Sequence, residues 1–241
     1  MAAKCKISRE KEGKPMKFGI IAGIGPASTV TYYEGIVSRY LEATGTYPRL
    51  VIESIDMNEM MACFEHSDDG GVIELISGAL DALARAGAEC AAIASNTPHI
   101  FFEEYKKRSP IPLLSIVDAT CEHIERVGYR NVLTLGTAFT LRSRLYENAL
   151  AARGIGTCPL SDADRDRLFG LFFPNLENGL VIPEDKAAVI DLTEHHIAAN
   201  KVDAVLLGCT EVPLMIRSDD LSVPTVDTAE VHVESIVARM I

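Results

Sequence analysis

Cys209 is the residue of this chain most able to do covalent or proton-transfer chemistry. It belongs to the segment Gly208-Cys209-Thr210-Glu211, which directly follows the apolar run 204–207. Glycine before the cysteine lets a ligand approach closely, and amides of a helix N-terminus or turn would lower the thiol pKa below its free value of about 8.5. A thiolate here could abstract a proton or act as a nucleophile. The alternative is an inert buried thiol.

A second polar cluster, Ser95-Asn96-Thr97-Pro98-His99, follows the apolar run 90–94. Ser, Asn and Thr all favour helix N-caps, but a cap needs only one such residue. The sequence therefore favours ligand binding at this cluster. We treat His99 as a candidate orienting residue, with a purely structural role as the alternative.

Two more loops are candidate binding segments. Gly136-Thr137-Ala138-Phe139-Thr140 carries two hydroxyls three residues apart, which could hold a carboxylate or cap a helix. The glycine-rich segment 19–26 does not complete the dinucleotide-binding fingerprint, because position 28, where the third glycine is required, is serine. It is not a phosphate-binding P-loop either, because no Gly-Lys-Ser/Thr follows it. It predicts a tight turn that contacts a ligand through Gly23 and Ile24.

Short apolar runs alternate with amphipathic stretches along the whole chain. The runs predict buried strands at 18–22, 50–55, 90–94, 113–117, 131–135 and 204–207. Helical spacing of apolar residues predicts helices at 28–41, 72–85, 100–107, 119–127, 141–152, 186–199 and 228–240. Alternation of this kind predicts an α/β fold with parallel sheets.

Segments in the first half of the chain also resemble segments in the second half, at a nearly constant separation in sequence. Gly23 corresponds to Gly136, Ser95 to Cys209, and Pro112 to Pro224. A duplicated α/β unit explains this better than the generic likeness of any two such units. Because loops after parallel strands form the ligand crevice, we expect Ser95 and Cys209 to lie across one cleft.

The repeat predicts two pseudo-symmetric domains after an N-terminal tail. We assign the tail to 1–17, the first α/β domain to 18–117 plus 226–241, and the second to 118–225. The last helix would then pack back onto the first domain.

The composition of the chain makes several classes of binding partner unfavourable. Among 241 residues, 23 are basic and 34 acidic, giving a net charge of −11 that disfavours nucleic acid and membrane surfaces as partners. The six cysteines form no C-x-x-C pair, so we predict no metal site and reduced thiols. The first 17 residues have no apolar core typical of a secretory signal, and no apolar stretch is long enough to span a membrane. We expect a cytoplasmic protein that binds a small molecule.

The motifs G-I-I-A-G-I-G-P, S-N-T-P-H, G-T-A-F-T and G-C-T-E-V-P-L, in this order, resemble the aspartate/glutamate racemase superfamily. The resemblance runs from Phe18 to the end of the chain. The segments SIDMNEM at 54–60 and RAGAE at 85–89 are similar to the branch containing bacterial aspartate/glutamate and broader amino-acid racemases.

The resemblance implies a cofactor-independent amino-acid racemase, commonly a homodimer, with two flavodoxin-like domains and the active site between them. In that family a thiolate removes the substrate α-proton, and a second thiol returns a proton to the opposite face. Carried onto this sequence, Cys209 and Ser95 take the catalytic positions, and Glu211 is a further candidate orienting residue. The residues implied to contact the α-carboxylate are Asn96, Thr97, Thr137, Thr140 and Thr210.

This sequence departs from the family pattern in two ways. Ser95 stands where the family usually has the first cysteine, and a hydroxyl is a far weaker acid than a thiol. The loop 56–61 holds no Arg or Lys, and 175–179 offers Glu177 instead of a basic residue. We predict an aspartate/glutamate-type amino-acid racemase. The alternatives are a single-cysteine enzyme like arylmalonate decarboxylase or maleate isomerase, and a catalytically impaired carboxylate-binding protein.

Overall fold

A computed structural model describes residues 15–176 and 179–241 and shows two parallel four-stranded sheets. The first sheet has the order β2-β1-β3-β4, with β1 Lys17–Ala22, β2 Arg49–Ser54, β3 Cys90–Ile93 and β4 Leu113–Leu114. The second has the order β6-β5-β7-β8, with β5 Asn131–Gly136, β6 Gly156–Cys158, β7 Ala204–Gly208 and β8 Thr225–Asp227. The shared strand order is what a duplicated unit predicts, and the α/β fold is confirmed.

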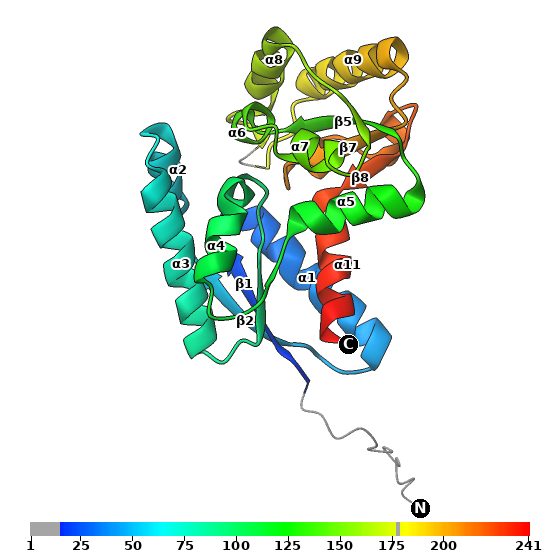
Figure 1. Ribbon diagram of the computed structural model, residues 1–241. Helices are drawn as coiled ribbons and strands as arrows, with labels where there is room; N and C mark the ends of the chain where they lie inside the picture. Colours follow the sequence, from blue (N-terminus) through cyan, green and yellow to red (C-terminus); the bar gives the residue numbers. More distant parts are fainter. Residues whose placement is uncertain (1–14, 177–178) are drawn as a thin grey trace, which may run out of the picture.

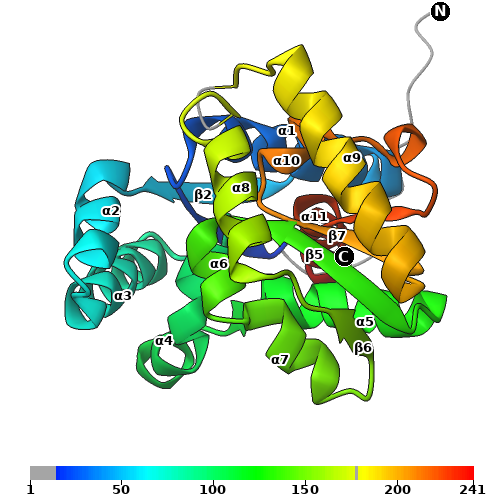
Figure 2. The ribbon, with the colours of Figure 1, turned by 90° about the horizontal axis from the view of Figure 1, so that it is seen from above.

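Each sheet forms a separate lobe with its own helices (Figure 1). The first lobe carries α1 Pro26–Thr44, α2 Met57–Glu65, α3 Asp69–Arg85, the 3₁₀ turn η1 Thr97–Phe101 and α4 Phe102–Arg108. The chain then passes through α5 Ile116–Val127 into the second lobe, which carries α6 Ala138–Arg142, α7 Leu145–Ala151, α8 Asp162–Phe172, α9 Pro183–Asn200 and α10 Val212–Met215. A 3₁₀ turn, η3 Ser218–Asp220, precedes β8. Seen from above, α8 and α9 lie over the second sheet (Figure 2).

The last helix, α11 Thr228–Met240, leaves the second sheet and returns to the first lobe beside α1 (Figure 1). Its residues Val233 and Ile236 share one core cluster with Phe18 of β1 and Ile36 of α1. The domain boundaries themselves stay a prediction.

Alternating side chains of β1 enter two different cores. Phe18, Ile20 and Ala22 pack toward α1 and α11, whereas Ile21 packs toward α2 and α3 with Leu80. Successive residues of a strand point to opposite faces, so a sheet covered by helices on both faces needs apolar residues at every position. This is why the strands appear in the sequence as unbroken apolar runs.

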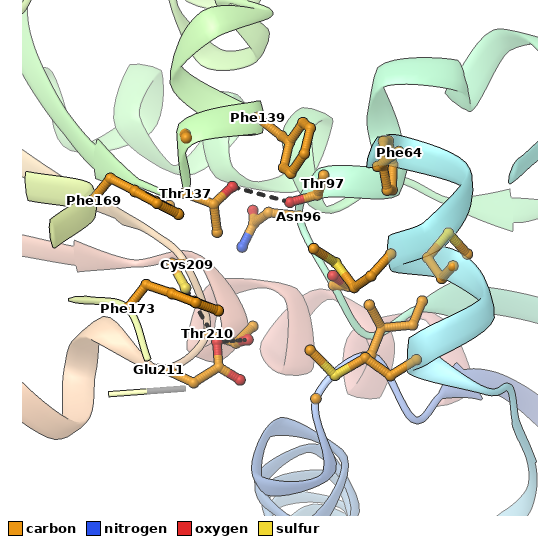
Figure 3. A pocket seen from close by; sticks show the side chains of 18 of the residues that line it. Phe64, Asn96, Thr97, Thr137, Phe139, Phe169, Phe173, Cys209, Thr210 and Glu211 are labelled. Atoms are coloured by element: carbon orange, nitrogen blue, oxygen red, sulfur yellow. Dashed lines mark hydrogen bonds between the residues drawn. The ribbon is translucent and has the colours of Figure 1, made fainter. Parts of the chain in front are cut away.

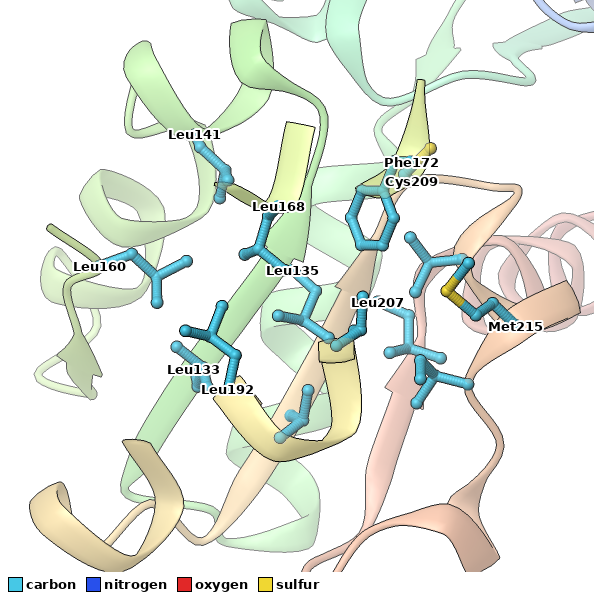
Figure 4. Close-up of a cluster of buried hydrophobic side chains, with 14 of the residues drawn as sticks. Leu133, Leu135, Leu141, Leu160, Leu168, Phe172, Leu192, Leu207, Cys209 and Met215 are labelled. Carbon is cyan, nitrogen blue, oxygen red and sulfur yellow. The ribbon is translucent and has the colours of Figure 1, made fainter. Parts of the chain in front are cut away.

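The second lobe holds the base of the Cys209 segment in the same way. Leu135 of β5, Leu207 of β7 and Phe172 of α8 belong to one buried cluster, and Cys209 lies at its edge (Figure 4). The end of β7 is therefore anchored in close-packed apolar side chains, which fixes where the cysteine emerges.

Three sequence predictions were wrong in detail. The strand predicted at 113–117 is only two residues long, because the Ser115 hydroxyl accepts a hydrogen bond from the Asp118 amide and begins α5. The helix predicted at 141–152 is broken at Arg144, whose φ is +55°. The strand predicted at 18–22 begins one residue earlier, at Lys17, and residues 1–14 of the predicted tail lie outside the described residues. No helix in the described ranges is long and apolar enough to cross a bilayer.

Candidate active site

A cavity of about 210 Å³ lies where the loops after β1, β3, β5 and β7 meet (Figure 3). Both lobes contribute to its lining. The structure brings together most of the predicted site residues there: Ile24, Ser95, Asn96, Thr97, Thr137, Cys209, Thr210 and Glu211. The carboxyl ends of parallel strands meet at one edge of each sheet, and the two edges face each other across the cavity.

The Cys209 thiol is paired with a carboxylate inside this cavity. Its Sγ donates to Glu211 Oε2 at 3.1 Å, and Thr210 Oγ1 donates to the same oxygen at 2.8 Å (Figure 3). Cys209 and Glu211 are each 9% exposed. The hydrogen bond gives the thiol proton an acceptor inside the cavity, which is the geometry that transfer of this proton to a general base requires.

Asn96 is fixed by two buried partners from the rest of the fold. Its Nδ2 donates to Thr228 Oγ1 at 3.1 Å, and its Oδ1 accepts a hydrogen bond from the Tyr146 hydroxyl. Thr228 in turn donates to the Leu207 carbonyl at 2.9 Å. The amide that faces the cavity is therefore held in one orientation by residues from β7, α7 and α11.

Three threonine hydroxyls join the two lobes beside Asn96. Thr97 Oγ1 lies 3.2 Å from Thr137 Oγ1 and 3.3 Å from Thr140 Oγ1, and Thr137 Oγ1 donates to Thr140 Oγ1 at 3.0 Å. Thr137 also caps α6 by accepting from the Thr140 amide at 3.2 Å. Thr97 and Thr137 line the cavity, whereas Thr140 is 1% exposed and lies behind them.

His99 does not reach the cavity. One ring nitrogen, Nδ1, bonds the Ser95 carbonyl at 2.9 Å, and Nε2 accepts from the Ile116 amide at 3.3 Å. Complete burial lowers the pKa of His99 to about 4, so its ring is neutral near pH 7. His99 holds the backbone of Ser95 in place and provides no base for the Ser95 hydroxyl.

Two glycines of the loop after β1, Gly23 and Gly25, have different structural roles. Gly23 has φ of +87° and lies outside the cavity lining, and a Cβ there would stand 2.5 Å from the Ile55 carbonyl. Gly25 lines the cavity, and a Cβ there would stand 2.8 Å from Glu211 Oε1. Gly23 therefore makes the turn, while Gly25, which sequence reasoning did not select, leaves room for the Glu211 carboxylate.

A scan against family models matches residues 21–236 to the family described as "Asp/Glu/Hydantoin racemase". The chain belongs to this racemase family. The match covers both lobes, and it confirms the resemblance found in the four motifs.

Relatives of known name support the same assignment at moderate identity. The broad-specificity amino-acid racemase of Bacillus subtilis is 28% identical over 151 residues, 56% of this chain and 61% of that protein. A glutamate racemase of Aquifex aeolicus is 28% identical over 139 residues, 54% of this chain and 49% of that protein. The matched part thus spans only about half to three fifths of these curated relatives.

Solved structures of the family match over nearly the whole chain. A putative Asp/Glu racemase from Yersinia pestis has a TM-score of 0.86 at 27% identity, covering 93% of this chain and 99% of that one. An aspartate racemase homologue from Pyrococcus horikoshii has a TM-score of 0.80 at 34% identity, covering 93% and 98%. Both lobes and their mutual arrangement are therefore shared with solved members of the family.

Sequence reasoning missed the apolar half of this racemase-family cavity. It is lined from α2 by Met57, Met60, Met61 and Phe64, and from the second lobe by Phe139, Phe169 and Phe173. The N-cap at Asp56, whose side chain accepts from the Asn58 amide at 2.8 Å, was the available signal for α2. Glu177 lies outside the described residues.

Proposed function

We propose that this protein exchanges the α-proton of an amino acid without a cofactor and thereby interconverts its enantiomers. The observation that carries this proposal is the 3.1 Å hydrogen bond from the Cys209 thiol to Glu211 inside a cavity lined by both lobes. Membership of the racemase family and the racemase names of its relatives support the reaction class.

In the proposed reaction, Glu211 takes the proton of the Cys209 thiol, and the resulting thiolate removes the substrate α-proton to become a thiol again. The charge that develops on the substrate α-carboxylate is stabilised by donors fixed beforehand, the Asn96 amide and the Thr97 hydroxyl, whereas the hydrogen of the Thr137 hydroxyl is already donated to Thr140. The carbanion is discharged when a proton returns to the same carbon. The site is reset when the proton on Glu211 goes back to the Cys209 thiolate, or passes to water where another group has supplied the returning proton.

The face of the α-carbon to which the proton returns decides whether the configuration is retained or inverted. Return from Cys209 gives exchange with retention, whereas inversion requires a proton from the opposite face, where we assign Ser95. A serine hydroxyl is a poor acid without a partner base, and both ring nitrogens of His99 are taken by backbone groups. We therefore expect exchange of one enantiomer to be faster than net racemisation.

The replacement of the first cysteine by Ser95 also favours a second candidate, a single-thiol decarboxylase acting on substituted malonates. Its substrate would bring two carboxylates into a cavity whose charged lining residues, among those described, are Glu65 and Glu211. Like charges disfavour that dianion more than a zwitterionic amino acid. Product analysis with malonates and with amino acids separates the two reactions.

The proposal is tested by incubating the protein with L- and D-amino acids in heavy water and following loss of the Cα–H signal by NMR. Cys209→Ala should lower the exchange rate by at least about 10²-fold. Cys158→Ala is the matched control, because Cys158 is 5% exposed in the same apolar cluster but does not line the cavity. Undiminished exchange in folded Cys209→Ala would remove the chemical basis of the proposal.

Independence from metals and pyridoxal phosphate, assembly as a homodimer and a cytoplasmic location are further parts of this proposal. Among the described residues, no three His, Cys, Asp or Glu side chains gather into a potential metal site. Exhaustive chelation should leave the exchange rate unchanged, and a rate restored by one added metal would contradict the proposed mechanism. Sedimentation analysis tests the dimer.

A further inference from the structure

The cavity lining has a polar part and an apolar part, and the apolar part lies on both sides of the polar one. Cys209, Glu211, Asn96 and the threonine hydroxyls form the polar part, where the reacting carbon and its carboxylate would lie. Figure 3 shows Phe64 and Phe139 on one side of this polar group, and Phe169 and Phe173 on the other. Together with three methionines from α2, these rings make up the apolar lining on both sides, which we call the apolar wall: Met57, Met60, Met61, Phe64, Phe139, Phe169 and Phe173.

The aromatic rings of the apolar wall form two pairs. Phe64 of α2 and Phe139 of α6 are 5.2 Å apart at their centroids, and this pair bridges the two lobes. Phe169 and Phe173, four residues apart at the end of α8, are stacked at 5.4 Å. These two rings are 42% and 45% exposed. Because contact of a phenylalanine ring with water is unfavourable, a ligand with apolar surface would be stabilised by covering these two rings.

Charge in the cavity is of one sign. Glu65 and Glu211 are the charged side chains among the described lining residues, and no lysine or arginine is among them. A substrate side-chain carboxylate would therefore leave water without meeting a cation, next to groups that repel it. Glu65 is instead complementary to the α-ammonium group of a zwitterionic amino acid, and so is Glu211 until it takes up the Cys209 proton.

Resting on the proposed function, we propose that the apolar wall binds the side chain of the substrate, and that this side chain is large and apolar, with an aromatic ring as its best occupant. Aspartate and glutamate are then poor substrates. The methionine side chains of α2 add to this fit, since they are flexible and contact aromatic rings favourably.

The first test compares exchange of L-phenylalanine and L-aspartate by the wild-type protein in heavy water, with D-enantiomers run in parallel. We expect kcat/KM for phenylalanine to exceed that for aspartate by at least about 100-fold, because an apolar pocket leaves a carboxylate unpaired. A ratio near one, or one favouring aspartate, would overturn the proposal.

A binding measurement separates this proposal from the proposed reaction. Calorimetric titration of Cys209→Ala with phenylalanine and with aspartate needs no turnover. Tighter binding of phenylalanine supports the proposal even if the wild-type protein exchanges neither amino acid, a result that would refute only the racemase reaction. Equal binding, tighter binding of aspartate, or no binding of phenylalanine would refute the assignment of the apolar wall.

A charge placed on the apolar wall should change the preference. Met61 is half-buried and lines the cavity, so Met61→Arg should shift the phenylalanine-to-aspartate ratio by at least about tenfold toward aspartate. Val127→Arg is the matched control, since Val127 is 49% exposed at the end of α5 and outside the cavity lining. A ratio unchanged in folded Met61→Arg would show that this wall does not face the substrate side chain.

Discussion

Gly25→Ala tests whether the Glu211 carboxylate is needed where the structure places it. Gly25 has φ of −36°, so alanine meets no left-handed backbone strain there. Its Cβ would stand 2.8 Å from Glu211 Oε1, and that oxygen must move by about 0.6 Å to reach the 3.4 Å of ordinary van der Waals contact.

The displaced group is the end of a flexible side chain, so the free energy of unfolding should fall by less than about 1 kcal/mol. The Cys209 thiol bonds the other carboxylate oxygen, Oε2, at 3.1 Å, and the planar carboxylate carries this oxygen along when Oε1 moves. Misplacement of this order in a reacting group lowers rates strongly, and we expect α-proton exchange to fall by roughly 10- to 100-fold.

The assay is exchange in heavy water, with urea unfolding of the same samples. Gly78→Ala controls for the glycine substitution itself, because a Cβ at this exposed position of α3 meets nothing within 4 Å. It should gain about 0.5–1 kcal/mol of stability at unchanged activity. Gly23→Ala, in contrast, must strain the backbone at φ +87° and should lose stability. Full activity in folded Gly25→Ala would refute the coupling of Glu211 to Cys209.

Three further outcomes are expected. Burial lowers the pKa of His99 to about 4 and that of His232 to about 3, so as the pH falls below about 6.5 the unfolded chain binds protons that the folded chain does not. The free energy of unfolding, measured with urea, should therefore fall by an amount on the order of 2 kcal/mol between pH 7 and 5.5. An unfolding free energy that stays constant over this pH range would contradict this. Tyr146→Phe removes the hydroxyl that donates to the buried Asn96 Oδ1 and should lower the unfolding free energy by about 1–3 kcal/mol in the same assay. An unchanged unfolding free energy would mean that another group donates to this oxygen. Ser95→Cys should raise the racemisation rate relative to exchange, followed by polarimetry and NMR, and an unchanged ratio would remove Ser95 from proton transfer.

The sequence by itself determined the fold class and the places where chemistry can occur. Apolar runs at β1, β3, β5 and β7 follow from strands buried on both faces, and such runs are visible without any tertiary information. The polar segments after β3 and β7 had to lie at the carboxyl ends of parallel strands. That topological rule, with the internal repeat, placed Ser95 and Cys209 in one cavity.

Tertiary structure alone decided which side chains face the ligand. Nothing in the pattern of residues 57–65 or 162–173 distinguishes a phenylalanine or methionine in a core from one that lines a cavity, because both are apolar positions on a helix. The same limit applies to His99, whose ring could point to Ser95 Oγ or to the backbone until the position of Ile116 is known. Contacts between residues far apart in the chain depend on how the two lobes meet, and periodicity carries no information about that.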